Sequence, residues 1–464
     1  MKYFFTLIFF ITATFTIQSQ SLGYQDLALL FSGNDNNGSA RFVAMSGAFG
    51  AVGGDISAMN INPAGIAVYK NSVFSGSIST RNTEITSTYY NNAITTEEAF
   101  FNASQAGAVF VFEALNDSKW SKFAVGFNYR ITKDFGNGFS AGGNSGIATF
   151  TDFPLDQNTP HLEYNISEEQ RFRSTIKGEL SEINIAFSSV HENKLYAGVG
   201  LNFYDLNFNQ EALLTEFNNA ATDDQELDID LYQVNNTIGT GFSLNAGFIY
   251  KAHKFFRFGL AYQTPIWFSE ILQDTNYGFD SENNIDVGFL QGETTFFTEE
   301  EAPYTEANDW QYIAYRLKTP SHLTASAAFI FGKSGLVSID YTNKNYQNIK
   351  LSEGYFLNEN QFFQNDLRAT HNVKIGTEWR MKRLSLRGGY QFEQSPLKNA
   401  SDLENTTGYS FGGGYHFGNS KFDLSYSKSN QNTAYDFYSQ FSNINAANLT
   451  TNNSKITATL TLNL

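Results

Sequence analysis

Residues 123–131 read FAVGFNYRI, with an apolar side chain at every odd position and a small or polar one at every even position. A period of two is the repeat of a β-strand, because successive side chains point to opposite faces of a pleated sheet. The alternation therefore predicts an all-β protein. It recurs in ten further segments, at 195–203, 242–250, 256–262, 323–331, 337–341, 373–379, 384–390, 409–417, 422–426 and 455–464.

The lengths of the links between these segments indicate how the strands are arranged. Short links alternate with long ones, and this sorting is typical of transmembrane barrels, with turns at the periplasmic end and loops outside. A soluble β-sandwich has no reason to sort its links in this way. If 71–90 is one long first strand, the sequence predicts a closed transmembrane β-barrel of fourteen antiparallel strands. The predicted long loops are 91–105, 134–172, 207–238, 266–312, 350–367, 396–405 and 432–453.

Composition supports this class and argues against others. The 464 residues include 45 Phe and 25 Tyr, and aromatics make up 16%, which suits strands with an aromatic outer surface. A formal charge of −16 argues against nucleic acid as a partner, since the chain offers little to neutralise phosphates. The absence of cysteine fits export through an oxidising compartment.

The N-terminal residues have the pattern of a secretory signal. Lys2 supplies a positive charge, residues 3–15 form a short, mainly apolar region, and mostly small and polar residues follow at 16–21. We therefore expect residues 1–20 to be a cleaved signal peptide. Together with the barrel pattern, this predicts a location in the outer membrane of a Gram-negative type of cell, among membrane lipid and lipopolysaccharide.

The two faces of the predicted strands differ in charge. An Arg or Lys facing lipid at mid-bilayer costs about 2–4 kcal/mol, so charged positions should face the lumen. Mixed signs predict a lumen that pairs internally or with a plug, and a water-filled, charge-lined pore is the alternative. We expect Phe127, Leu201, Phe248, Leu260, Phe329 and Leu386 to face lipid, and Arg130, Arg257, Asp340, Lys374, Glu378, Arg387 and Asp423 to face inward.

Residues 21–70 are not strand-like and are rich in small side chains, which allow close packing in a confined lumen. They contain GSAR at 38–41, an MSGAF run at 45–49, Asp55, and the motif Asn62-Pro63-Ala64-Gly65. This stretch resembles the hatch of the FadL/TodX family of outer-membrane transporters. A second match is FGLAYQTPI at 258–266, where Thr264 replaces the family's usual Ser.

The resemblance implies a hatch at 21–70, including Asn62, Pro63, Ala64 and Gly65, inside a barrel at 71–464. It also implies passive uptake of a hydrophobic small molecule, of the long-chain fatty acid or aromatic type. The ligand would first land in an apolar groove among the outer loops and then move into the lumen. Movement of the hatch or a break in the barrel wall would release it.

Two predicted loops carry candidates for that groove. Residues 211–217 read as one or two helical turns with an apolar face, and the start of the next long loop has apolar residues at helical spacing. The alternative is that these residues only pack the loops together as a lid. The candidates are Leu213, Leu214, Phe217, Trp267, Phe268, Ile271 and Leu272.

Other chemistry finds little support. The six histidines are scattered, which argues against zinc and against a haem ligand pair, and we expect no cofactor or metal. His371 and His416 lie on predicted strands, but no Ser can be assigned as the partner that a phospholipase needs, so we expect no enzyme. Clustered carboxylates at 270–309 could bind Ca²⁺, although a solvated loop explains them more simply.

One alternative function stays open. Some relatives of the family, such as the PorV-type subunit of the type IX secretion machinery, are partner barrels in larger assemblies and transport no small molecule. A chain of this kind would bind other outer-membrane proteins of a protein-secretion or barrel-assembly machine. It would need a large apolar patch outside the aromatic belts, whereas a transporter needs a concave apolar groove.

Overall fold

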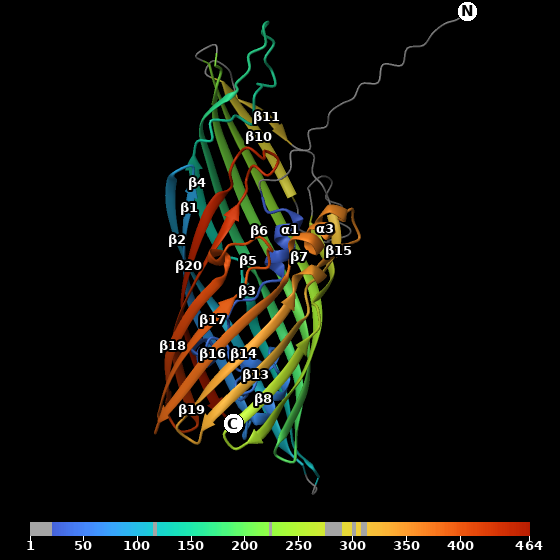
Figure 1. Cartoon of the computed structure of the whole chain (residues 1–464), viewed down its shortest axis with the longest axis vertical. Helices are drawn as coiled ribbons and strands as arrows, with labels where there is room; N and C mark the ends of the chain where they lie inside the picture. Colours follow the sequence, from blue (N-terminus) through green and yellow to red (C-terminus); the bar gives the residue numbers. More distant parts are fainter. Residues whose placement is uncertain (1–20, 115–117, 222–224, 274–289, 299–302, 308–312) are drawn as a thin grey trace, which may run out of the picture.

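The computed structural model describes the chain except for residues 1–20, 115–117, 222–224, 274–289, 299–302 and 308–312. The predicted signal peptide lies outside the described residues. The described part is mainly one antiparallel sheet, which closes on itself because the first strand pairs with the last, from Val73 opposite Asn463 to Thr88 opposite Asn448 (Figure 1).

Fourteen strands form the wall, each paired antiparallel with the next, so the predicted barrel is confirmed. We call the end with the long connections, uppermost in Figure 1, the long-loop end. The wall strands are β1 (Val73–Tyr89), β2 (Asn92–Glu113), β3 (Trp120–Asp134), β5 (Ile166–His191), β6 (Leu195–Asn219), β7 (Glu226–His253), β8 (Phe256–Gln263), β13 (His322–Phe331), β14 (Gly335–Asn345), β16 (Ala369–Met381), β17 (Leu384–Glu393), β18 (Thr406–His416), β19 (Ser420–Tyr435) and β20 (Ala447–Asn463).

Shorter elements extend the sheet or cover its long-loop end. The strands β9 and β12 prolong β8 and β13, while β10 adds to the tall edge of β7. These elements are β4 (Asn137–Gly143), β9 (Trp267–Gln273), β10 (Leu290–Thr298), β11 (Tyr304–Ala307), β12 (Ile313–Lys318), η3 (Tyr346–Asn348), β15 (Lys350–Ser352), α3 (Leu357–Asp366) and η4 (Asp402–Glu404).

The two faces of the wall are as predicted. Phe127, Phe329 and Leu386 are 44%, 44% and 47% exposed, as a lipid-facing belt requires, whereas Arg130 and Arg387 are only 4% and 6% exposed on the luminal side. Aromatic and aliphatic side chains thus cover the outside, and the charged residues are kept from the bilayer.

The strands are taller than predicted, and the predicted loop 207–238 is wrong for most of its length, since β6 and β7 continue through it. The phase of the alternation inverts along β6. Val199 and Phe203 are exposed on the outer face, whereas Phe208 and Leu214, at even positions, are buried on the inner face. Beyond the bilayer the outer face meets water and the inner face meets apolar side chains, so the apolar residues change sides. The predicted loops 91–105, 134–172, 266–312 and 432–453 also contain strand residues.

The segment before the wall lies inside the barrel, in blue in Figure 1. It forms α1 (Tyr24–Phe31), α2 (Ala40–Ala44), η1 (Ile56–Asn60) and η2 (Pro63–Val68), and from residue 40 to residue 67 almost every side chain is buried. Among the described residues, no helix has the length and apolar character needed to cross a bilayer.

Candidate functional site

The predicted hatch motif forms the start of η2 and fits closely against the wall. The Asn62 side chain accepts a hydrogen bond from the Ala64 amide at 3.2 Å and donates to the Gly50 carbonyl at 2.8 Å. Pro63 occupies the first helical position, where its missing N–H is harmless. A Cβ at Gly198 of β6 would lie 2.6 Å from the Ala64 nitrogen, so only glycine permits this approach.

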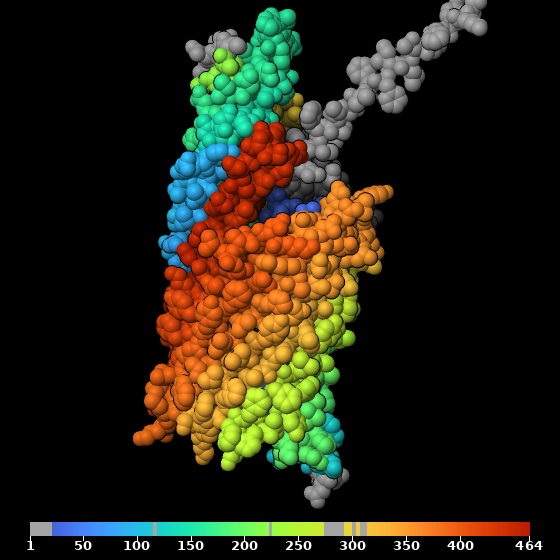
Figure 2. All heavy atoms as spheres, viewed as in Figure 1, coloured from blue at the N-terminus to red at the C-terminus, as the bar shows by residue number. Residues whose placement is uncertain are grey.

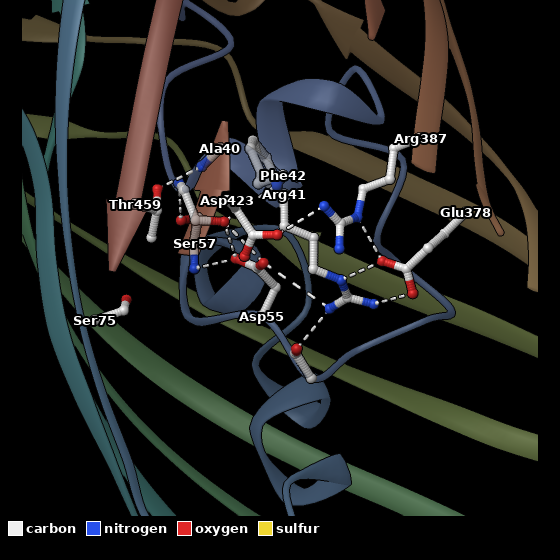
Figure 3. A network of polar contacts seen from close by, with 12 residues as sticks. Ala40, Arg41, Phe42, Asp55, Ser57, Ser75, Glu378, Arg387, Asp423 and Thr459 are labelled. Carbon is white, nitrogen blue, oxygen red and sulfur yellow. Dashed lines mark hydrogen bonds and ion pairs between the residues drawn. The ribbon is translucent and has the colours of Figure 1, made fainter. Parts of the chain in front are cut away.

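A chain of buried charges ties the hatch to the wall (Figure 3). Arg41 Nε lies 2.7 Å from Glu378 of β16, and Arg387 Nε of β17 lies 2.6 Å from the same carboxylate. Arg387 also pairs with Asp423 of β19 at 2.8 Å. Burial raises the pKa of Asp55, although Arg41 opposes this and Ser39 donates a hydrogen bond at 2.8 Å. The prediction that the mixed luminal charges pair with a plug is confirmed here.

Neutral contacts fasten the hatch to the same side of the wall. The Ala40 amide donates to Thr459 Oγ1 of β20 at 2.7 Å. The hydroxyls of Ser46 and Ser410 of β18 lie 2.8 Å apart. The hatch is therefore hydrogen-bonded to strands at the C-terminal end of the barrel.

At the upper edge of the hatch, Asp35 joins the loop after α1 to β3. Its carboxylate pairs with Lys133 at 2.9 Å and accepts from the Asp134 amide at 3.0 Å. Burial opposes ionisation of Asp35, but Lys133 and the amide outweigh it, so its pKa lies below the ordinary value. The charged form thus stabilises this edge of the hatch.

At the upper end of the hatch, α1 is packed into an inner apolar cluster. Phe31 contacts Phe135 and Phe208 at ring distances of 5.6 and 5.5 Å, and Tyr24 contacts Tyr315 at 5.6 Å. Burial raises the pKa of Tyr24 to about 12, so its hydroxyl stays neutral at physiological pH. The other buried members are Leu27, Ala28, Ile176, Leu180, Tyr204, Leu206, Ile266, Phe268, Ile271, Leu317, Tyr346, Ile349, Leu351, Phe356, Phe363 and Leu367.

A second, outer apolar cluster lies further toward the long-loop end, on the same inner faces of β5 and β6. One polar rung separates the two clusters, where Gln210 donates to Ser174 and to Tyr435 at 3.0 Å each. The cluster consists of Ile85, Tyr89, Phe139, Ala141, Phe172, Ala212, Leu214, Leu231, Phe437, Tyr438, Ile444, Ala447 and Leu449.

The long-loop end is hollowed beside these clusters. Figure 2 shows dark blue atoms of the N-terminal segment in a hollow between the red tops of β19 and β20 and the orange region around α3. Gly23 and Asp26 of this segment are exposed, whereas Leu27 and Phe31 are buried. The surface of α1 can thus be reached from outside the barrel.

The wall is interrupted between β2 and β3. Their backbone pairing ends at Gln105 opposite Arg130, after which β3 bulges and β4 pairs only with β5. Side chains bridge the interruption, because Asp134 pairs with Arg81 at 2.9 Å and accepts from Asn102 at 2.6 Å. The next residue along the chain, Phe135, belongs to the inner apolar cluster. The cluster therefore reaches the wall where its backbone ladder stops.

The predicted groove residues do not form helical turns, and that prediction is wrong. Leu213, Leu214 and Phe217 lie on β6, and Trp267, Phe268, Ile271 and Leu272 lie on β9. The structure divides the set between two faces of the sheet.

Leu214 enters the outer cluster, and Phe268 and Ile271 enter the inner one. By contrast, Phe217 lies under Arg171 on the outer face, with the guanidinium 4.9 Å from the ring. A bulge at Ser269 explains why two residues three apart face the same way.

Sequence reasoning missed α1, although the spacing of Tyr24, Leu27, Ala28 and Phe31 is that of a helix with one apolar face. Most of the acidic residues predicted as a possible calcium loop lie outside the described residues. Within the described part of the chain, no group of three His, Asp or Glu side chains is arranged to hold a metal ion.

These features define a hatch-plugged, fourteen-stranded transmembrane β-barrel. Among solved structures, it is similar to the Pseudomonas putida toluene transporter TodX, at 15% identity over 93% of this chain and 99% of that one, with a TM-score of 0.54. A Pseudomonas aeruginosa FadL homologue is 12% identical over 93% and 99%, with a TM-score of 0.55. The CymD monoaromatic hydrocarbon channel is 12% identical over 92% of this chain and 98% of that one, with a TM-score of 0.54.

At such identities the likeness shows a shared fold, which confirms the predicted resemblance. No family model and no curated protein matches the chain.

Proposed function

We propose that this protein is an outer-membrane channel for the passive uptake of hydrophobic small molecules. The observation that carries the proposal is the pair of apolar clusters in series on the inner faces of β5 and β6, above a polar, hatch-filled lumen. Apolar side chains inside a barrel offer a ligand a place to leave water, at about 0.8 kcal/mol per buried CH₂. Such apolar clusters are not expected in a water-filled pore.

The substrate class we propose is a long-chain or aromatic compound. The clusters are rich in phenylalanine and tyrosine, which suit flat or flexible apolar molecules. Two proteins of the same fold are described as a toluene transporter and a monoaromatic hydrocarbon channel, which supports the aromatic class.

We further propose that the molecule leaves sideways, through the interruption between β2 and β3. Two observations support this path. The hatch is held to the wall by the buried Arg41–Glu378 pair and by the Ser46–Ser410 contact, so moving it would break many bonds. At the interruption no backbone ladder has to open, and the bonds to be broken are those of side chains, such as Arg81 to Asp134 and Asn102 to Asp134.

Uptake of radiolabelled toluene into lipid vesicles that contain the purified barrel tests the function. Phe208→Asp places a charge in the inner cluster and should lower uptake at least tenfold, since an isolated buried charge is strongly disfavoured. The matched control is Asn207→Asp, which adds the same charge one residue away on the exposed outer face of β6 and should leave uptake unchanged.

Both variants must yield heat-modifiable barrels in equal amounts. Normal uptake by Phe208→Asp would contradict the proposal. Absence of uptake by the unaltered protein, with a partner protein co-purifying, would favour the partner-barrel alternative.

A further inference from the structure

The connection between β19 and β20 folds back into the barrel mouth as a cap. We define the cap as residues 436–446. Its outward residues Ser439 to Asn443 are exposed, whereas Phe437, Tyr438 and Ile444 are only 2%, 4% and 5% exposed and point into the outer apolar cluster. The inward-facing side of the cap therefore packs against the barrel mouth through these three large side chains.

The ring of Phe437 lies in a setting built from other rings. It stacks on Phe172 of β5 with centroids 4.7 Å apart and planes inclined by 4°, and it meets Tyr89 of β1 at 5.0 Å. Phe172 also contacts the rings of Phe139 and Tyr435, at 5.7 and 5.3 Å. The wall therefore supplies Phe172 as a stacking surface and Tyr89 as a neighbour at the side. The ring between them, Phe437, comes from the cap.

A polar latch holds the cap in place. The Tyr438 hydroxyl donates to Glu216 of β6 at 2.7 Å. Glu216 also accepts from the Thr149 hydroxyl at 2.8 Å, from the Asn218 amide at 2.8 Å and from the Phe150 nitrogen at 3.3 Å. When Tyr438 moves away, the Glu216 carboxylate keeps its other hydrogen-bond partners. Opening the cap therefore leaves no buried charge without a partner.

We propose that Phe437 occupies an aromatic binding site at the mouth of the barrel, and that a flat aromatic ligand binds there by displacing it and lifting the cap. The incoming ring recovers the stacking on Phe172 that Phe437 gives up. The remaining cost of opening is the burial of Tyr438 and Ile444, the hydrogen bond from Tyr438 to Glu216, and the bond from the Asn445 amide to the Tyr90 hydroxyl at 3.0 Å. The ligand binds only protein whose cap is open, so its apparent affinity is the intrinsic affinity multiplied by the fraction of protein with an open cap. This site rests on the proposed uptake function, as the first stop on the path.

The test uses iodobenzene, whose iodine is located by anomalous scattering in crystals of the full-length protein. We expect iodine density against Phe172, in the space that Phe437 fills without ligand, and a displaced cap.

Iodobenzene affinity is measured by calorimetry on the same protein. Tyr438→Phe removes only the latch hydroxyl and should raise the affinity about tenfold, as loss of a hydrogen bond to a charged group implies. Ser442→Ala removes a hydroxyl from the exposed side of the same cap and should leave the affinity unchanged.

Iodine found only in the inner apolar cluster or on the lipid-facing belt would overturn the proposal. An affinity that Tyr438→Phe leaves unchanged would do so as well. Failure of this site is distinct from failure of the channel function. If iodobenzene binds against Phe172 but the protein moves no toluene into vesicles, the binding site is supported and the uptake function is contradicted. Toluene uptake without such binding rejects the site alone.

Discussion

Replacing Arg41 by Met should loosen the hatch without opening the barrel wall. Arg41 donates to Glu378 at 2.7 Å and to the Gly54 carbonyl at 2.7 Å, with its side chain 11% exposed and that of Glu378 1% exposed. Breaking a buried ion pair costs about 3–5 kcal/mol. Glu378 keeps its contacts with Arg387 at 2.6 Å and Arg380 at 2.5 Å, so we expect the lower end, about 3 kcal/mol.

Native-state hydrogen exchange, read by mass spectrometry, measures this change locally. A loss of about 3 kcal/mol corresponds to roughly a hundredfold faster exchange of the amides between residues 39 and 57, while amides of the wall strands keep their rates. The control is Arg316→Met, which removes an ion pair with Glu353 whose side chains are both 56% exposed. A surface pair of this kind contributes under about 1 kcal/mol and should not affect the hatch.

Hatch exchange that rises less than threefold in Arg41→Met would contradict this expectation. Wall strands that exchange faster to the same extent as the hatch would contradict it as well. The first result would mean that the pair contributes little, and the second that the hatch and the wall unfold as one unit.

Three further expectations concern transport and pH. A disulfide formed in Ser46→Cys/Ser410→Cys should leave toluene uptake within twofold of its reduced form, and loss of uptake on oxidation would mean that the hatch has to move. Because the pKa of Asp35 is lowered, its contribution is complete above about pH 4 and is lost as the pH falls through the lowered value. Hydrogen exchange around it, corrected for intrinsic rates, should accelerate only at such acid pH, and acceleration already at pH 6 would contradict this. Leu214→Ser should lower uptake and Leu213→Ser should not, since only Leu214 lies in the outer cluster; equal effects would argue against that cluster as part of the path.

The fold could be predicted because lipid imposes one rule on every strand. Where a strand crosses the bilayer, its outer positions are apolar, and the alternation has a constant phase. Beyond the bilayer the rule reverses, as Phe203 and Phe208 on β6 illustrate by lying on opposite faces. When the alternation of apolar and polar residues changes phase within one strand, the pattern looks like the end of that strand. For this reason the sequence pattern predicts loops where the tall parts of β6 and β7 continue.

The candidate site was less predictable than the fold. The hatch motif at Asn62 to Gly65 was identified through its resemblance to a family, and its close fit to Gly198 depends on a strand 136 residues away from Asn62 in the sequence. The pairing of Phe268 with Ile271 on one face depends on a bulge, which periodicity cannot reveal. Both clusters depend on contacts between distant segments, and no local pattern encodes them.

The contacts between hatch and wall also constrain the order in which the molecule is assembled. Ala40 is bonded to Thr459, 419 residues later, and β1 can pair with β20 only after the last strand has been made. The hatch is synthesised first, yet its anchoring partners on β18 and β20 arrive last. Its native bonds to these strands can therefore form only late, once the C-terminal strands have taken their places in the wall. Until then the hatch has to remain able to fold, so its delayed anchoring is a requirement of biogenesis as well as of transport.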